Sequence, residues 1–338
     1  MGIRLIEDLD SLLSSGPVAS DGLLSDVDTW CQGVAESARI PVTGRPGPDS
    51  SVAGAIERVV WRAKVNHAAA GVGCTPPDTP DHVRTPPAYD SGQRLDPGLW
   101  ALDYSPRHGF DAFDHLFQSA MTQNALGRAA SPTLPDAALA ALRSGLITVR
   151  DHLPLISSTT LPLVHLVLVH RSPIESMYLM QLPETIVVND ELLLKDTGRV
   201  AEAILHESLH EKSAALRQIR WLLAPALDTA ERFRLSLPWY PPRRRREFDA
   251  WRLLSAGHVY THIALLNAAM GTPQSIERAR ECAARASFMM AALADQRFSR
   301  ALAVDGNALV CQLTEALKSM PSGHAYPLTE EHIIQGES

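Results

Sequence analysis

Hydrophobic positions along the chain recur mostly with the period of an α-helix. Near the N-terminus, Ile3, Leu5, Ile6 and Leu9 fall on one helical stripe, and the segment 52–70 repeats the pattern. The same spacing predicts further helices at 110–126, 137–152, about 199–223, about 248–270, 275–295 and 307–319.

Two short runs have a different pattern, in which β-branched and apolar residues follow one another without a helical period. One run spans 163–169 (LVHLVLV), and the other spans 185–188 (TIVV) and is ended by Asn189 and Asp190. Both runs predict buried strands. The sequence therefore predicts a mainly α-helical fold with a small β-sheet, of the α+β class.

The helical pattern is interrupted by a segment that is dense in proline. Seven of the 24 prolines lie between Pro76 and Pro106. Proline fixes φ and removes a hydrogen-bond donor, so the segment 74–107 is expected to be a long irregular crossing or a linker. The last stretch, 321–338, is expected to be a frayed tail.

Composition excludes several classes of protein. The chain has 338 residues, 45% of them hydrophobic, and a net charge of −7, which is typical of a globular protein and argues against a nucleic-acid binder. Its longest apolar run, 161–169, is too short for a membrane helix, and the N-terminus lacks the apolar core of a secretory signal. The four cysteines have no paired spacing. We therefore expect reduced thiols in a cytoplasmic protein.

A metal-binding motif lies in the middle of the helix predicted at 199–223. His206, Glu207 and His210 form H-E-x-x-H, and residues four apart lie on one helical face, so both imidazoles can reach one ion. Glu207 stands where it can hold a metal-bound water or act as a base. A short strand followed by such a helix is a zincin-like local arrangement.

The rest of this helix allows two interpretations. An apolar stripe would bury the helix against the core and leave the motif at the border of a cleft. Alternatively, the motif belongs to a solvated charged face. The stripe consists of Leu205, Leu209, Leu216 and Leu223, and the charged residues are Glu202, Glu211 and Lys212.

Two histidines do not complete a metal site, so we expect a third protein ligand. The metzincin pattern would need histidine at position 216, which is Leu216. Glu231 and Glu247 lack the sequence setting of a gluzincin ligand. His258 and His262 lie one turn apart on the next long helix, and we favour His258, although either one is also a candidate core histidine.

The order of these segments resembles a known family. A strand with ETIVVND, a helix with HESLH, the segment LPWYPP with arginines and a helix with SAGHVYTHIAL follow one another between 163 and 270. This order is similar to the HExxH-motif family found beside ribosomal-peptide biosynthetic genes, whose members are iron(II)/2-oxoglutarate-dependent peptide β-hydroxylases. The resemblance implies His206, His210 and His258 as iron ligands. It also implies Glu207 as a site residue rather than a protease base.

The implied cosubstrate needs a fixed cation for its distal carboxylate. The arginines available are the run 243–246, before the His258 helix, and Arg252 on that helix. We favour Arg252 or Arg246. The run of four also has the composition of a solvated basic loop or of a surface that attracts an acidic leader peptide.

Together these features predict three regions and one leading function. Residues 1–150 form a mostly helical region, residues 151–320 a metal-binding catalytic region, and residues 321–338 the tail. The leading hypothesis is an oxygenase that uses Fe(II) and 2-oxoglutarate to hydroxylate an unactivated β-carbon in a peptide, expected to be a precursor peptide. A zinc metallopeptidase with Glu207 as general base is the alternative, and a non-catalytic peptide-binding protein is the third. For residues 1–150 the sequence leaves three roles open: a site for a leader peptide, a lid, or the surface of a homodimer.

Overall fold

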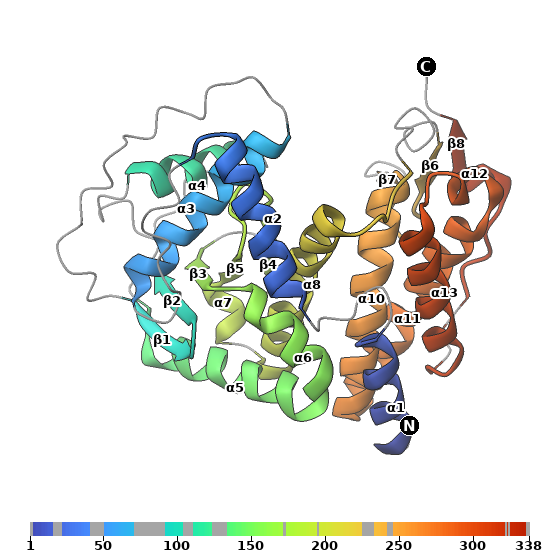
Figure 1. Ribbon diagram of the computed structural model, residues 1–338. Helices are drawn as coiled ribbons and strands as arrows, with labels where there is room; N and C mark the ends of the chain where they lie inside the picture. The colour runs from blue at the N-terminus through green and yellow to red at the C-terminus, as the bar shows by residue number, and fades with distance from the viewer. Residues whose placement is uncertain are drawn as a thin grey trace. The chain divides into compact units, whose positions relative to one another are not determined.

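The computed structural model describes residues 3–15, 22–40, 51–70, 92–103, 111–123, 134–171, 174–194, 196–224, 233–241, 246–321, 323 and 325–335. Over these residues the chain is mainly α-helical with two small sheets, which confirms the predicted fold class (Figure 1). None of the helices described there is long and apolar enough to cross a membrane.

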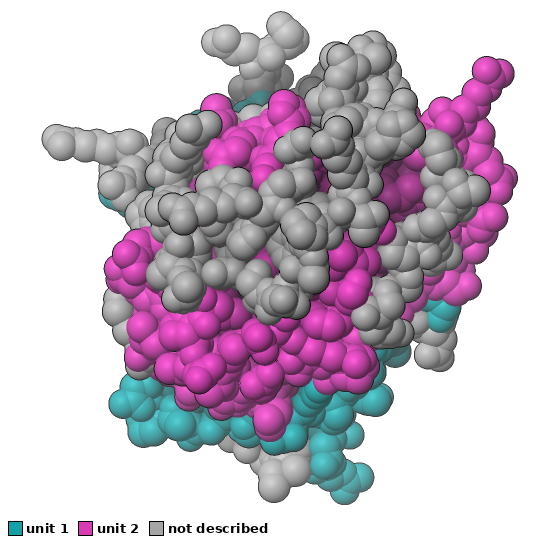
Figure 2. All heavy atoms as spheres, turned by 90° about the vertical axis from the view of Figure 1, so that its left-hand side faces the viewer, with its two compact units in different colours: residues 1–23, 149–159, 212–338 teal, residues 24–148, 160–211 magenta. Residues whose placement is uncertain are grey.

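The chain divides into two compact units, and both are discontinuous in sequence (Figure 2). Unit 1 consists of Met1–Leu23, Val149–Thr159 and Lys212–Ser338. Unit 2 consists of Leu24–Thr148 and Thr160–Glu211. These units differ from the regions 1–150, 151–320 and 321–338 expected from the sequence.

Unit 2 contains a five-stranded sheet in the order β1-β2-β3-β5-β4. The central strands β2, β3 and β5 are parallel, and the end strands β1 and β4 are antiparallel to their neighbours. Every residue of β3 and β5 is buried, as expected for central parallel strands built from continuous apolar runs. The strands are β1 (Gln93–Asp96), β2 (Leu99–Asp103), β3 (Leu166–His170), β4 (Ser176–Tyr178) and β5 (Thr185–Asn189).

Helices complete the core of unit 2. Val59 on α3 and Phe113 and Phe117 on α4 belong to one apolar cluster with Leu168 on β3 and Val187 on β5. The helices here are α2 (Leu23–Ser37), α3 (Val52–Ala69), α4 (Asp111–Gln123), α5 (Asp136–His152), the 3₁₀ turn η2 (Leu161–Leu163), α7 (Asp190–Leu193) and the first four turns of α8 (Thr197–Ile219).

Unit 1 is built around an antiparallel pair of long helices, α10 (Ala250–Met270) and α11 (Pro273–Ala294). Gly271 ends α10 at φ 70°, a left-handed conformation that glycine adopts without a Cβ clash, and the Thr272 side chain then caps α11 by accepting from the Ser275 N–H. The other elements are α1 (Ile3–Leu13), α6 (Pro154–Thr160), α12 (Gln296–Ser299), α13 (Val304–Lys318), η4 (Glu330–His332), β6 (Phe233–Ser236), β7 (Glu247–Phe248) and β8 (Ile333–Gln335).

Two expectations from the sequence are corrected. Residues 92–103 lie inside the predicted irregular crossing 74–107, but they form β1 and β2, which turn at Gly98 with φ 75°. β2 then pairs in parallel with β3, and sheet pairing overrides the local proline content. Residues 74–91 and 104–107 lie outside the described residues.

The predicted frayed tail is also wrong for part of its length. β8 pairs with β6, so that Phe233 faces Gln335, and this forms a three-stranded antiparallel sheet in the order β7-β6-β8. Arg297 donates to both carboxylate oxygens of Glu330, at 2.6 and 3.1 Å. Strand pairing and this ion pair fix a segment whose composition alone indicates no structure.

Candidate metal centre

The motif helix α8 is buried along most of its length. Leu205, Leu209 and Leu216 are at most 1% exposed, which confirms three members of the predicted apolar stripe. The fourth, Leu223, lies beyond the end of α8 at Ile219 and is half-buried, so the predicted helix 199–223 is too long. The alternative of a solvated charged face is wrong, because Glu211 is 3% exposed and Lys212 is fully buried. A helix buried in this way holds its remaining polar side chains in fixed positions.

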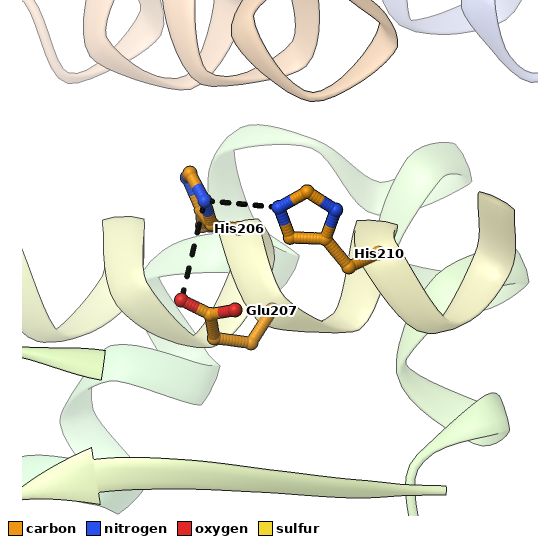
Figure 3. A group of neighbouring side chains, drawn as sticks. All are labelled: His206, Glu207 and His210. Atoms are coloured by element: carbon orange, nitrogen blue, oxygen red, sulfur yellow. Dashed lines mark hydrogen bonds and ion pairs between the residues drawn. The ribbon is translucent and has the colours of Figure 1, made fainter. Parts of the chain in front are cut away.

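His206 and His210 project from one face of α8 toward each other (Figure 3). Their Nε2 atoms lie 3.2 Å apart. Two ligand atoms that are each about 2.1 Å from one ion are separated by roughly 3.0–3.4 Å in octahedral or tetrahedral geometry. The pair therefore fits a single metal ion without rearrangement. Among the described residues, His206, Glu207 and His210 form the one group of three metal-ligating side chains, with ligand atoms within 4.8 Å of one another.

Glu207 is a buried carboxylate next to this pair. One of its oxygens, Oε1, accepts from the Ser176 hydroxyl at 2.6 Å and lies 4.0 Å from Nε2 of His206. The main-chain N–H of Tyr178 also donates to this carboxylate. Burial raises the pKa of Glu207 to about 7, because desolvation outweighs the hydrogen bonds from Ser176 and Tyr178. A buried carboxyl group with this pKa, 4.0 Å from Nε2 of His206, can exchange a proton near neutral pH.

The imidazole of His210 is held in the form that binds metals. Burial, with a smaller contribution from the neighbouring His206, lowers the pKa of His210 to about 3, so its ring is neutral at physiological pH. Tyr178 stacks on this ring with centroids 6.0 Å apart and planes inclined by 20°. The Tyr178 hydroxyl is hydrogen-bonded to the carboxylate of Glu211, the residue that follows His210 on α8.

The favoured third ligand lies in the other unit. His258 is 1% exposed on α10, and its Nδ1 lies 3.2 Å from the Ser213 hydroxyl oxygen. His262 is fully buried and donates from Nδ1 to the His258 carbonyl oxygen at 2.7 Å. Because His206 and His210 belong to unit 2 and His258 to unit 1, the third ligand stays a prediction.

The packing of α10 against α11 explains why glycine precedes His258 at position 257. A Cβ on Gly257 would lie 2.2 Å from the Met290 Cε atom of α11, so glycine allows the close approach of α10 and α11.

The candidate carboxylate-binding arginines also lie in unit 1. The guanidinium of Arg246 lies over the Tyr240 ring, 5.1 Å from its centroid. Arg252 is exposed in the first turn of α10, where its main-chain N–H donates to the capping carboxylate of Asp249 at 2.7 Å. Their role toward a cosubstrate stays a prediction, and 243–245 lie outside the described residues. Of the glutamates considered as ligands, Glu247 pairs with Ser236 across β7 and β6, and Glu231 is not described.

A buried charge network beside the site was not predicted. Arg58 on α3 donates to both oxygens of Glu184, at 2.6 and 3.0 Å, and to Asp28 at 3.3 Å. Arg62, one turn later and 1% exposed, has its Nε 3.9 Å from Glu184. The sequence signal is two arginines four residues apart on the face of α3 that also carries buried valine and isoleucine.

The comparisons with known proteins assign no family to this chain. No protein-family model matches it, and no curated protein matches it. Function is therefore inferred from the geometry of His206, Glu207 and His210 and from the order of motifs in the sequence.

Proposed function

We propose that this chain is an oxygenase that uses iron(II) and 2-oxoglutarate to hydroxylate the β-carbon of a residue in a peptide. The observation that carries the proposal is the pair of histidine Nε2 atoms 3.2 Å apart, with a buried carboxylate beside them. Histidine and carboxylate donors suit iron(II). The order of motifs between 163 and 270 favours this metal and this cosubstrate over zinc alone.

The chain's own residues have distinct tasks in this proposal. His206 and His210 hold the ion as neutral imidazoles, with His258 as the proposed third ligand. Iron and 2-oxoglutarate held there would supply activation of O₂, of which one oxygen atom would enter the C–H bond and the other would enter succinate as 2-oxoglutarate loses CO₂. Glu207 is kept next to His206 by its hydrogen bonds from Ser176 and Tyr178, where it can hold a proton or a water.

The end strand β4 supports a peptide as the substrate. Glu175 and Asn189 form a hydrogen-bonded pair, with Asn189 N–H donating to the Glu175 carbonyl at 2.8 Å. In an antiparallel pair, alternate residues direct their main-chain N–H and C=O groups toward and away from the partner strand. Ser176 and Tyr178 therefore direct these groups away from β5. β4 ends the sheet, so an extended peptide can add beside Glu207 as a further strand only at main-chain groups other than the Tyr178 N–H, which donates to Glu207. Met180, just after β4, is 67% exposed and available to an apolar side chain of the peptide.

Anaerobic reconstitution tests the proposal. The full chain is loaded with iron(II), and absorption spectra are recorded with and without 2-oxoglutarate. We expect a weak visible band that appears only with 2-oxoglutarate and is lost in His206→Ala. His115→Ala, at an exposed histidine of α4 in the same unit, is the matched control and is expected to keep the band. Absence of the band, with one tightly bound zinc per chain, contradicts the proposal.

A zinc metallopeptidase is the second candidate, and the position of Glu207 favours it. A buried carboxyl with a pKa of about 7, 4.0 Å from a ligand nitrogen, suits a general base for water attack on an amide. This candidate predicts peptide cleavage by the zinc-loaded chain without 2-oxoglutarate. Glu207→Gln is expected to abolish cleavage and to keep the zinc. If wild type and His206→Ala bind peptide equally well, and neither hydroxylation nor cleavage is observed, the chain is instead a non-catalytic peptide-binding protein.

A further inference from the structure

One strand residue, Tyr178, contacts both functional side chains of the motif helix. Its ring stacks on His210, and its main-chain N–H donates to the carboxylate of Glu207. Its neighbour on the same side of the strand, Ser176, donates to Glu207 as well, at 2.6 Å. The geometry of the metal pair therefore depends on where β4 lies against α8.

The hydroxyl of Tyr178 is fixed from the other side by Glu211. This carboxylate, 3% exposed, accepts from the Tyr178 hydroxyl and from the main-chain N–H of Glu184. The positive charge of Arg62 acts on Glu211 and on Tyr178 alike. Glu211 thus joins the tyrosine to the charge network.

Glu184 anchors this network at the turn between β4 and β5. Its main chain adopts φ 59°, a left-handed conformation that a non-glycine residue rarely adopts. The guanidinium of Arg58 donates two hydrogen bonds to the Glu184 carboxylate, at 2.6 and 3.0 Å. Nε of Arg62 lies 3.9 Å from the same carboxylate. Two arginines of α3 therefore fix the turn that leads from β4 into β5.

We propose that Tyr178 is a positioning residue of the metal centre, which holds His210 through its ring and Glu207 through its main-chain N–H, while Glu211 and the arginines of α3 fix the tyrosine itself. This inference rests on the proposed metal site at His206 and His210. It does not depend on whether iron or zinc is the resident metal, nor on the reaction. Residues that orient metal ligands from outside the coordination sphere typically affect metal affinity about 10- to 100-fold.

Tyr260 provides a matched control in the other unit. It is also a largely enclosed tyrosine, with its hydroxyl hydrogen-bonded to the guanidinium of Arg285, and burial raises its pKa. Its hydroxyl partner lies on α11 and is not part of the motif helix. Tyr260→Phe therefore removes the same hydroxyl from a similar environment without touching His210 or Glu207.

Cobalt(II) titration of the full chain tests the proposal, because cobalt reports both affinity and ligand geometry. The affinities of wild type, Tyr178→Phe, Tyr178→Leu and Tyr260→Phe are measured by chelator competition, and the visible cobalt spectrum and thermal unfolding are recorded for each. We expect Tyr178→Leu to bind cobalt about tenfold more weakly and with a shifted spectrum. Tyr178→Phe is expected to give a smaller loss and a smaller shift. Tyr260→Phe is expected to lower the unfolding temperature but to keep wild-type affinity and spectrum.

Each outcome decides a different point. Wild-type affinity and an unchanged spectrum in Tyr178→Phe and Tyr178→Leu overturn the positioning role while the metal site stands. If Tyr178→Leu does not fold, Tyr178→Phe alone decides, and equality with wild type overturns the role. A wild-type chain that binds no cobalt or zinc overturns the proposed metal site, and the positioning role with it.

Discussion

Two consecutive residues of α8, one in each unit, are buried side chains that ionise with opposite sign. Glu211 is 3% exposed and ends a segment of unit 2, and Lys212 is fully buried and begins a segment of unit 1. Burial moves both groups toward their neutral forms: it raises the pKa of Glu211 to about 7 and lowers the pKa of Lys212 to about 7. The same desolvation thus acts on both, and the units differ in the partners they provide.

The partners in unit 2 form a connected network, and those in unit 1 form separate contacts. In unit 2, Arg58 donates two hydrogen bonds to the Glu184 carboxylate, and the main-chain N–H of Glu184 donates to Glu211. In unit 1, the carboxylate of Asp10 accepts from the main-chain N–H groups of Leu155 and Ile156, at 2.9 Å each. Lys212 donates to the Thr159 hydroxyl at 3.0 Å and is attracted by Asp10 without a direct hydrogen bond among those described. Breaking the network is expected to cost more than removing the isolated charge.

The largest effect is expected from Arg58→Met. The substitution leaves Glu184 buried without its forked partner, and loss of one member of a buried ion pair costs about 3–5 kcal/mol. The free energy of unfolding from urea titration measures it. Arg143→Met, at an exposed arginine that donates to the Arg94 carbonyl, is the control and is expected to change stability by less than about 0.5 kcal/mol. Equal effects of the two substitutions would show that the network stabilises nothing.

An intermediate effect is expected from Asp10→Ala in unit 1. The substitution removes the acceptor of two main-chain N–H groups at the start of α6, which costs about 2 kcal/mol. Asp8→Ala, at an exposed position of the same helix, is the control and is expected to be nearly neutral. A loss as large as that of Arg58→Met would contradict the contrast between the units.

The smallest effect at pH 7 is expected from Lys212→Met. An apolar residue of similar length replaces a charge that burial disfavours, so the change in unfolding free energy is expected to stay within about 1 kcal/mol. Urea titrations of both proteins at pH 7 and pH 9 provide the measurement.

The sign of the pH dependence follows from the lowered pKa of Lys212. Between pH 7 and 10.5 the unfolded chain holds a proton that the folded chain has released, so the lysine contribution rises with pH across this window and is lost as pH falls. The slope is at most about 1.4 kcal/mol per pH unit. Wild type is expected to gain stability relative to Lys212→Met on going from pH 7 to 9, and a constant difference would contradict the lowered pKa.

Local patterns were enough to predict the helix that carries His206 and His210 and the long helix that carries His258. Their apolar spacing is strong over many turns, and the burial of Leu205 and Leu209 follows from it. The proline-rich segment was different, because β2 is stabilised by pairing with β3, and β1 by pairing with β2, rather than by their own residues. A strand of three residues such as β4 carries too little pattern to be recognised.

The surroundings of the candidate site could not be predicted for a second reason. Arg58 and Glu184 are 126 residues apart in sequence, and no spacing rule connects them. The role of Tyr178 depends on the register of β4 and on the position of Glu211, and both are set by the tertiary fold. Sequence spacing gives the residues that share a helix face, but not the strand that lies against it.

The discontinuity of unit 1 has a consequence for the ribosome-bound chain. The side chain of Gln312 on α13 donates to the carbonyls of Leu12 and Ser15, and 300 residues separate Leu12 from Gln312. At roughly 5–20 residues per second, α1 waits about 15–60 s after its own synthesis for this partner. Leu9 and Leu13, buried in the finished protein, stay without α13 during that time and without α10 for most of it. We therefore expect the nascent chain to present the apolar face of α1 to chaperones until α10 and α13 have been made, and unit 1 to close only then.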